Sequence, residues 1–294
     1  MRAGASRLQR GLTSNRHAGR PDRKSVRAFA FMTMHWCVAR AERSSPTALS
    51  PAMTVDIDLF IRKLRARHEL SRDEESALRS MRWSQRRYER GETMVRAGQQ
   101  LEHSMLLLGG WAIRCKYAPD GARQIVEINL AGDFIDLHGF ILKRLDHEIS
   151  AASRCEIATV PHSELRRVSE QLPRLARVLW FQTLVDAAIH REWMLVLGKK
   201  RSRSRIAQFF CEMHARLQIV GQAGDGEFAL PFSQQQLADI TGMTPVHANR
   251  SLKELRDAGL VTFRNGRVAL HNPAGLASDA KFDSGYLHLG PHEF

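Results

Sequence analysis

Residues 230–261 read LPFSQQQLADITGMTPVHANRSLKELRDAGLV, and the pattern of this stretch predicts the fold of the carboxyl-terminal part of the chain. Ser233, followed three residues later by Gln236, is a capping box and predicts the first turn of a helix. Gly242 ends that helix and permits a sharp turn, because glycine adopts backbone angles that other residues avoid. A second helical pattern begins directly after the turn. Two short helices joined by a tight glycine turn are typical of a helix-turn-helix.

The second helix of this pair is predicted to begin after Thr244. Thr244 is a favourable N-cap, and Pro245 occupies the first helical position, where its missing amide proton is not needed. Ala248, Leu252 and Leu255 repeat at helical spacing and form the side that faces the core. In a helix-turn-helix the second helix enters the major groove of DNA.

Mostly polar side chains cover the outward face of the second helix. We expect its first turns to read base edges, since an arginine can bind guanine bidentately and a valine methyl group can contact thymine. The residues expected to read bases are Val246, His247, Asn249 and Arg250. The residues expected to contact phosphates are Ser233, Thr244, Lys253, Arg264 and Arg267. The alternative is that these side chains only keep a helix surface soluble, as exposed polar residues often do.

A β-hairpin is predicted directly after the second helix. Residues 260–270 read LVTFRNGRVAL, in which Asn265-Gly266 is a strong signal for a two-residue hairpin turn. Arg264 and Arg267 flank the tip, where they can meet phosphates and set the register on DNA without reading its sequence. A helix-turn-helix followed at once by a hairpin is a winged helix. The sequence therefore predicts a carboxyl-terminal domain that binds double-stranded DNA.

The stretch from about residue 84 to 160 is rich in short apolar or alternating runs, which are typical of β-strands. Residues 106–117 read LLLGGWAIRCKY, and residues 123–130 read RQIVEINL. Between them, Pro119-Asp120-Gly121 predicts a tight turn, because proline sets φ and glycine accepts a positive φ. Several short strands with glycines at the corners predict a small barrel or roll.

A helical region over residues 162–198 is predicted to carry a dimer contact. Its apolar residues occupy nearly all sides, and a helix of that kind must be buried on more than one side. We expect one side to pack on the roll and a stripe on the other to form a coiled-coil-like seam with a second copy. The stripe consists of Leu175, Leu179, Val185, Ile189 and Val196. The alternative is a central helix buried wholly within one chain.

The first 52 residues hold ten basic and two acidic residues, a large part of the net charge of +13, and they show no sustained periodicity. A helical apolar pattern starts only after Met53, with Ile57, Phe60 and Leu64 among its members. We expect translation to start at Met53 and residues 1–52 to be an annotation artefact. A disordered basic arm is the alternative.

Several function classes find no support in the composition. The cysteines, at positions 37, 115, 155 and 211, lack the spacing that zinc or an iron–sulfur cluster needs. We expect mostly buried thiols, with a single redox-sensing thiol as the alternative. No apolar run is long enough for a membrane span. We also expect no metal and no enzymatic activity, because Walker, Gly-x-Ser-x-Gly and paired-histidine motifs are missing.

The order of these parts, a β-roll, a long helix and a terminal winged helix, resembles the Crp/Fnr regulators. The resemblance covers about residues 84–270, and its most specific pieces are Gly132-Asp-Phe and the stretch LADITGMTPVHANRSL from Leu237. It implies an α+β fold with an N-terminal double-stranded, jelly-roll-like β-roll, a long dimerisation helix and a C-terminal winged helix-turn-helix. It also implies a cytoplasmic homodimer on a roughly palindromic DNA site, RNA polymerase as a further partner, and Arg250 as a reader of guanine.

Departures from the cAMP-responsive members of that family bear on the effector. Those members bind the ribose through a Gly-Glu-Leu carboxylate and the cyclic phosphate through an Arg-Ser pair. Here Leu137 stands where the glutamate is expected, and residues 145–151 read LDHEISA without such a pair. A buried phosphate without its arginine is poorly compensated, so we expect cAMP to bind weakly or not at all. The candidate effector pocket consists of Asp136, Leu137, His138 and His147.

Three kinds of signal stay open: an unidentified small effector, a single-thiol switch, or control by expression level alone. The predicted parts of the chain are an extension, disordered or mis-annotated (1–52), N-terminal helices with the roll (53–160), a dimerisation helix region (162–198), the winged helix-turn-helix (199–275) and a flexible tail (276–294). We expect a sequence-specific DNA-binding transcription regulator. The alternative is a cyclic-nucleotide-sensing signalling module without DNA binding, which should keep the phosphate-binding arginine.

Overall fold

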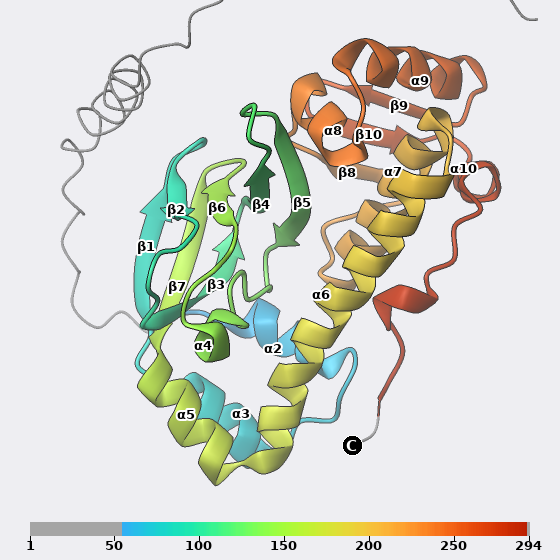
Figure 1. Ribbon diagram of the computed structural model, residues 1–294. Coiled ribbons are helices and arrows are strands. Elements are labelled where there is room, and N and C mark those ends of the chain that lie inside the picture. The colour runs from blue at the N-terminus through green and yellow to red at the C-terminus, as the bar shows by residue number, and fades with distance from the viewer. Residues whose placement is uncertain (1–54, 293–294) are drawn as a thin grey trace, which may run out of the picture. The chain divides into compact units, whose positions relative to one another are not determined.

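The computed structural model describes residues 55–292 (Figure 1). The expectations for residues 1–52 lie outside this part of the chain. The described part begins with two short helices, α2 (Asp58–Arg65) and α3 (Arg72–Arg79). The apolar residues whose spacing predicted the first of them are buried, as expected. Both helices pack beneath the β-roll (Figure 1).

Antiparallel strands form the β-roll. They are β1 (Ser84–Tyr88), β2 (Thr93–Val95), β3 (His103–Gly109), β4 (Trp111–Tyr117), β5 (Arg123–Leu130), β6 (Glu148–Ala151) and β7 (Cys155–Pro161), with the short helix α4 (Gly139–Leu142) between β5 and β6. One sheet has the order β2-β6-β4-β5 and the other the order β1-β7-β3. β4 and β5 form a hairpin that pairs Trp111 with Leu130 and Tyr117 with Arg123. The tight turn predicted at Pro119-Asp120-Gly121 joins the two strands.

Two helices follow the roll: α5 (His162–Gln171) and the 27-residue α6 (Pro173–Lys199). The stripe on α6 that we expected to form a dimer seam is buried within the chain itself. Its members are Leu175, Leu179, Val185, Ile189 and Val196, and all are less than a tenth exposed. The first two pack against the helices below the roll, and the next two pack against Leu287. The assignment of this stripe to a partner chain is therefore wrong, because a helix that is apolar on most sides does not reveal which side its own chain covers.

The carboxyl-terminal domain, called the reading head below, is the predicted winged helix. It contains α7 (Ser202–Ile219), β8 (Glu227–Ala229), α8 (Gln234–Thr241), α9 (Pro245–Asp257), β9 (Val261–Arg264), β10 (Arg267–Leu270) and α10 (Pro273–Ala280). The capping box at Ser233 is formed, and Gly242 ends α8 with a φ of 60°. Asn265 and Gly266 have φ values of 50° and 70°, as a type I′ hairpin turn requires. These three predictions are confirmed.

The expected flexible tail over residues 276–294 is wrong for its described part. Leu276 and Ala280 are buried in α10, and Leu287 is buried in a short 3₁₀-helix, η1 (Gly285–Leu287). Figure 1 shows this part leaving α10 and running beside α6. The apolar residues here are few and widely spaced, so their burial depends on a surface that other parts of the chain supply.

Candidate DNA-binding face and effector cavity

The outward face of α9 is open to solvent. The side chains expected to read bases, Val246, His247, Asn249 and Arg250, are all exposed. Val246 is 75% exposed, which is unusual for an apolar residue at the start of a helix. The opposite side is buried through Ala248, Ser251 and Leu255, while Leu252 is only half-buried. The helix therefore has one face that holds it to the core and another that is free for a partner.

The residues expected to contact phosphates surround that face and are exposed: Ser233, Thr244, Lys253, Arg264 and Arg267. Two of them also cap helices. The Ser233 hydroxyl accepts a hydrogen bond from the Gln236 amide at 3.1 Å, and the Thr244 hydroxyl accepts one from the His247 amide at 3.4 Å. The amino ends of α8 and α9, which carry partial positive charge, thus lie at the exposed surface and could bind a phosphate there.

Arginines at this surface have only weak partners within the chain. Arg250 donates from Nε to Glu254 at 3.2 Å, and its side chain is 80% exposed. Arg267 lies 3.6 Å from Glu227, and both of those side chains are exposed. Exposed ion pairs contribute little free energy, so a base or a phosphate can replace the carboxylate.

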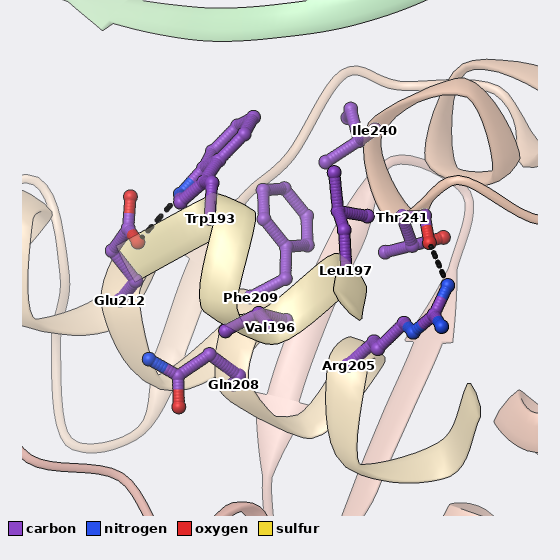
Figure 2. A pocket seen from close by; sticks show the side chains of 9 residues that line it. All are labelled: Trp193, Val196, Leu197, Arg205, Gln208, Phe209, Glu212, Ile240 and Thr241. Carbon is purple, nitrogen blue, oxygen red and sulfur yellow. Dashed lines mark hydrogen bonds between the residues drawn. The ribbon is translucent and has the colours of Figure 1, made fainter. Parts of the chain in front are cut away.

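A narrow pocket lies where α6, α7 and α8 meet (Figure 2). Its walls include Trp193, whose indole nitrogen donates to Glu212 at 2.8 Å, and Arg205, which donates to the Thr241 carbonyl at 3.3 Å. The first bond joins α6 to α7, and the second joins α7 to α8. Gly242 suits this position because its φ is 60°, and a Cβ here would also lie 2.9 Å from Cδ2 of Leu197. This junction holds the reading head on the end of α6.

A second contact joins the reading head to the β4–β5 hairpin. Arg123 donates from Nε and Nη2 to one oxygen of Asp239 in α8, at 2.9 and 2.6 Å. The Trp111 ring meets the Phe232 ring edge-on, with centroids 5.5 Å apart, and both belong to one hydrophobic cluster. Sequence analysis did not find this contact, because the partners are more than a hundred residues apart.

An open recess of about 390 Å³ lies between the roll and the middle of α6. It is lined by Arg114, Val126, His138, Asp146, His147, Thr183, Asp186, Ala187 and His190. Of the four predicted pocket residues, His138 and His147 line this cavity. Asp136 and Leu137 do not: both are buried behind it, and Leu137 belongs to the core below the roll. Their assignment to the cavity wall is wrong, since neighbouring residues in the turn before α4 point in different directions.

Three histidines line the cavity, and the hydrogen bond to Glu127 raises the pKa of one of them, His190. The pKa values of the other two are lowered. Burial lowers the pKa of His138 to about 3, and burial also lowers the pKa of His147. His147 has Nδ1 at 3.0 Å from Asp146, while its Nε2 is buried without a hydrogen-bond partner. Behind them, Asp136 accepts a hydrogen bond from the Met105 amide at 2.6 Å, and burial raises its pKa to about 7.

An arginine does line the cavity, but it comes from β4 and not from residues 145–151, where the Arg-Ser pair is missing. Arg114 on β4 ion-pairs with Glu127, its cross-strand neighbour on β5, and lies 3.3 Å from Asp186 of α6. Burial would raise the pKa of Glu127, but Arg114 and then His190 lower it to about 2. The charge of Arg114 is therefore already balanced by carboxylates. The sequence shows one charged residue in each of two apolar strands. It predicts that the two form an ion pair only if the register between β4 and β5 is known.

Comparisons with known proteins agree with this architecture. Residues 85–171 match the cyclic nucleotide-binding domain family, and residues 204–278 match the Crp-like helix-turn-helix domain family. The chain is 31% identical to a probable transcriptional activator of Rhizobium leguminosarum bv. viciae over 184 residues, which are 62% of this chain and 75% of the relative. It is 26% identical to the transcriptional activator protein FnrL of Cereibacter sphaeroides, covering 68% of this chain and 81% of that protein.

Among solved structures, the chain is similar to FixK2 from Bradyrhizobium japonicum, with a TM-score of 0.62 and 26% identity over 67% of this chain and 96% of that one. The chain belongs to the Crp/Fnr family of transcription regulators. It is a DNA-binding regulator, and a signalling module without DNA binding is not favoured, because the helix-turn-helix match covers the reading head.

Three cysteines of this Crp/Fnr regulator are free and buried: Cys115, Cys155 and Cys211. Burial raises the pKa of all three thiols, to about 11 for Cys115 and about 12 for Cys211. Cys37 lies outside the described residues. Within residues 55–292, no helix is both long and apolar enough to cross a membrane. The same residues bring together no group of three or more side chains that could hold a metal ion.

Proposed function

We propose that this Crp/Fnr regulator binds a two-fold symmetric DNA site as a homodimer, with α9 of each copy in the major groove. The observation that carries the proposal is the division of α9 into a buried side and an exposed side. The exposed side presents Val246, His247, Asn249 and Arg250, ringed by the predicted phosphate contacts. Each good bidentate contact to a base contributes about 1–3 kcal/mol of discrimination.

The dimer seam that we propose lies on a different face of α6 from the buried stripe. Three large apolar side chains at helical spacing are exposed there: Trp180, Leu184 and Met194, at 65%, 51% and 66%. Steps of three and four residues connect the positions of this seam, which are Arg177, Trp180, Leu184, Ala187, Arg191, Met194 and Gly198. This is the spacing of the inner positions of a two-stranded coiled coil, and four of the seven residues are apolar, so the occupant that we propose is α6 of a second copy.

A homodimer built in this way places two α9 helices about 34 Å apart, one turn of DNA, and the two half-sites follow that spacing. We further propose that the regulator works in the cytoplasm, where its DNA lies, and that RNA polymerase is its next partner, as expected of a transcription regulator. It acts by binding alone, without catalysis.

We propose that the cavity beside α6 does not serve cAMP. The cyclic phosphate would need an unengaged cation, and Arg114 is already paired with Glu127 and Asp186. Burial lowers the pKa of His138 and His147, and His190, whose pKa is raised, is paired with Glu127 at 2.9 Å. An uncharged or cationic small effector suits this wall better than an anion. The single-thiol switch is disfavoured for the three buried cysteines, since a raised pKa suppresses the reactive thiolate.

The experiment that tests the proposed function is selection of sites from random DNA by the purified full-length protein. We expect an enriched palindrome whose half-sites lie about ten base pairs apart, bound by two copies. An enriched single half-site would contradict the dimer, and no enrichment above random DNA would contradict base reading by α9.

A further inference from the structure

The segment 282–292, called the strap below, lies beyond both stretches that match the domain families. It follows α10, which packs on α7 within the reading head. Figure 1 shows the strap leaving α10 and passing along α6. The strap therefore starts in the DNA-binding domain and ends on the other part of the molecule.

The first anchor of the strap is apolar. Leu287 is fully buried and packs with Val185 and Ile189 of α6. Phe282 and Tyr286 are partly buried against the same cluster. The face of α6 that we had assigned to a partner chain is thus covered by the carboxyl-terminal segment of the same chain.

The second anchor is a set of hydrogen bonds with Arg67, which lies two residues after the end of α2 and is only 4% exposed. Its guanidinium donates to the Leu287 and His288 carbonyls at 3.1 and 3.0 Å, and its own carbonyl accepts from the His292 amide at 2.6 Å. A buried guanidinium must find acceptors, and here the strap backbone supplies two of them. The reading head is thereby connected to the helices below the roll.

The third anchor is a buried carboxylate at the junction drawn in Figure 2. Glu212 of α7 accepts a hydrogen bond from the Trp193 indole of α6 at 2.8 Å, which Figure 2 shows. It accepts another from the Tyr286 hydroxyl of the strap, also at 2.8 Å. Arg216 adds a third at 3.3 Å from within α7. One side chain of the reading head therefore joins the long helix and the strap at the point where the head would pivot.

We infer that the strap is a clasp that fixes the orientation of the reading head on α6 and so preorganises it for DNA. The strap contacts none of the residues proposed to read bases, so it does not block the DNA-binding face. A head that is already held in one orientation loses less freedom when it binds, and its affinity is higher for that reason. This inference rests on the DNA binding proposed above.

The test compares strap variants of the full-length protein with matched controls. Leu287→Ala empties the apolar anchor, and Tyr286→Phe removes one hydroxyl from Glu212. Their controls are Leu142→Ala and Tyr117→Phe, since these two residues are largely exposed elsewhere. Fluorescence anisotropy gives the Kd for the selected DNA site over a range of salt concentrations. Hydrogen exchange of the α7 and α8 amides reports the mobility of the head without DNA.

We expect Leu287→Ala to raise the Kd about tenfold and Tyr286→Phe about threefold, with faster exchange in α8 and no change in either control. The salt dependence should stay the same, since the phosphate contacts are untouched. If Leu287→Ala unfolds the chain, as judged by circular dichroism, Tyr286→Phe decides alone.

An unchanged Kd with unchanged exchange would overturn the clasp, and a lower Kd would show that the strap inhibits binding instead. Arg250→Ala, measured in parallel, separates this inference from the proposed function. If that variant keeps its site preference while the strap variants lose affinity, the base-reading assignment fails and the clasp stands.

Discussion

Asp239 in α8 accepts two hydrogen bonds from Arg123 in the β4–β5 hairpin, at 2.9 and 2.6 Å. A helix of the DNA-binding domain is thus tied to the β-roll of the same chain. The Asp239 side chain is only a tenth exposed, so it depends on this arginine for its compensation.

The Arg123–Asp239 pair should stabilise the contact between roll and head. We expect a double-mutant cycle of Arg123→Ala and Asp239→Ala to give a coupling free energy of about 1–3 kcal/mol. Charge-assisted, partly buried hydrogen bonds stabilise a protein more than exposed ion pairs do. The measurement is urea unfolding of the single and double variants. The same cycle on Arg87 and Glu156, an exposed pair within the roll, is the control. Coupling near zero at both pairs would contradict the prediction.

Arg250 and Arg267 should differ in the kind of DNA binding that they support. We expect Arg250→Ala to weaken the selected site by about 1–3 kcal/mol and random DNA much less, because it removes a base contact. We expect Arg267→Ala to weaken both alike and to reduce the salt slope by about one. Gel-shift titration on both DNAs checks this, with Arg256→Ala near the other end of α9 as the control. An unchanged site preference in Arg250→Ala would show that α9 is misoriented in our proposal.

The exposed seam on α6 should hold two copies together. We expect Leu184→Glu to convert the dimer to a monomer, because the substitution places two like charges at the centre of a coiled-coil seam. Sedimentation velocity measures the change. Ile141→Glu, at a more exposed position on the separate helix α4, should leave the dimer intact. Dissociation by the control alone would move the interface to α4.

cAMP should find no site in the cavity. We expect isothermal titration to detect no binding at micromolar concentrations, because the arginine of the cavity is paired with two carboxylates. Glu127→Gln frees part of that charge, and any weak binding should increase in this variant. Micromolar affinity in the unaltered protein would refute the prediction.

Asp136 should make the chain less stable as the pH rises towards neutrality. Burial raises its folded-state pKa from about 4 to about 7, so the folded protein holds this proton more tightly than the unfolded chain. The stabilisation is fully present below about pH 4 and is lost as the pH rises through 7. As the pH rises from 4 to above 7, we expect the free energy of unfolding of Asp136→Asn to increase by roughly 2–4 kcal/mol relative to that of the unaltered protein. Denaturant unfolding at pH 4 to 8 measures it, and a pH-independent difference would contradict the shift.

Local signals predicted the reading head well. The capping box at Ser233, the glycine turn at Gly242 and the hairpin turn at Asn265-Gly266 each form as expected. These signals work because a cap or a turn is satisfied by neighbours in sequence, so no distant partner has to be known. The exposed face of α9 followed from the same periodicity.

The faces of α6, the wall of the cavity and the strap were decided by tertiary structure alone. A helix that is apolar on most sides can bury any of those sides. On α6, the buried side is the one that contacts Leu287 and the helices below the roll. Arg114 meets Glu127 and Asp186 only after the strands and α6 have assembled. Local patterns thus predicted the elements and their caps, since these depend on short-range backbone hydrogen bonds. Which side of α6 turned inward depended on burial against segments far away in sequence, among them α2 and the carboxyl-terminal segment.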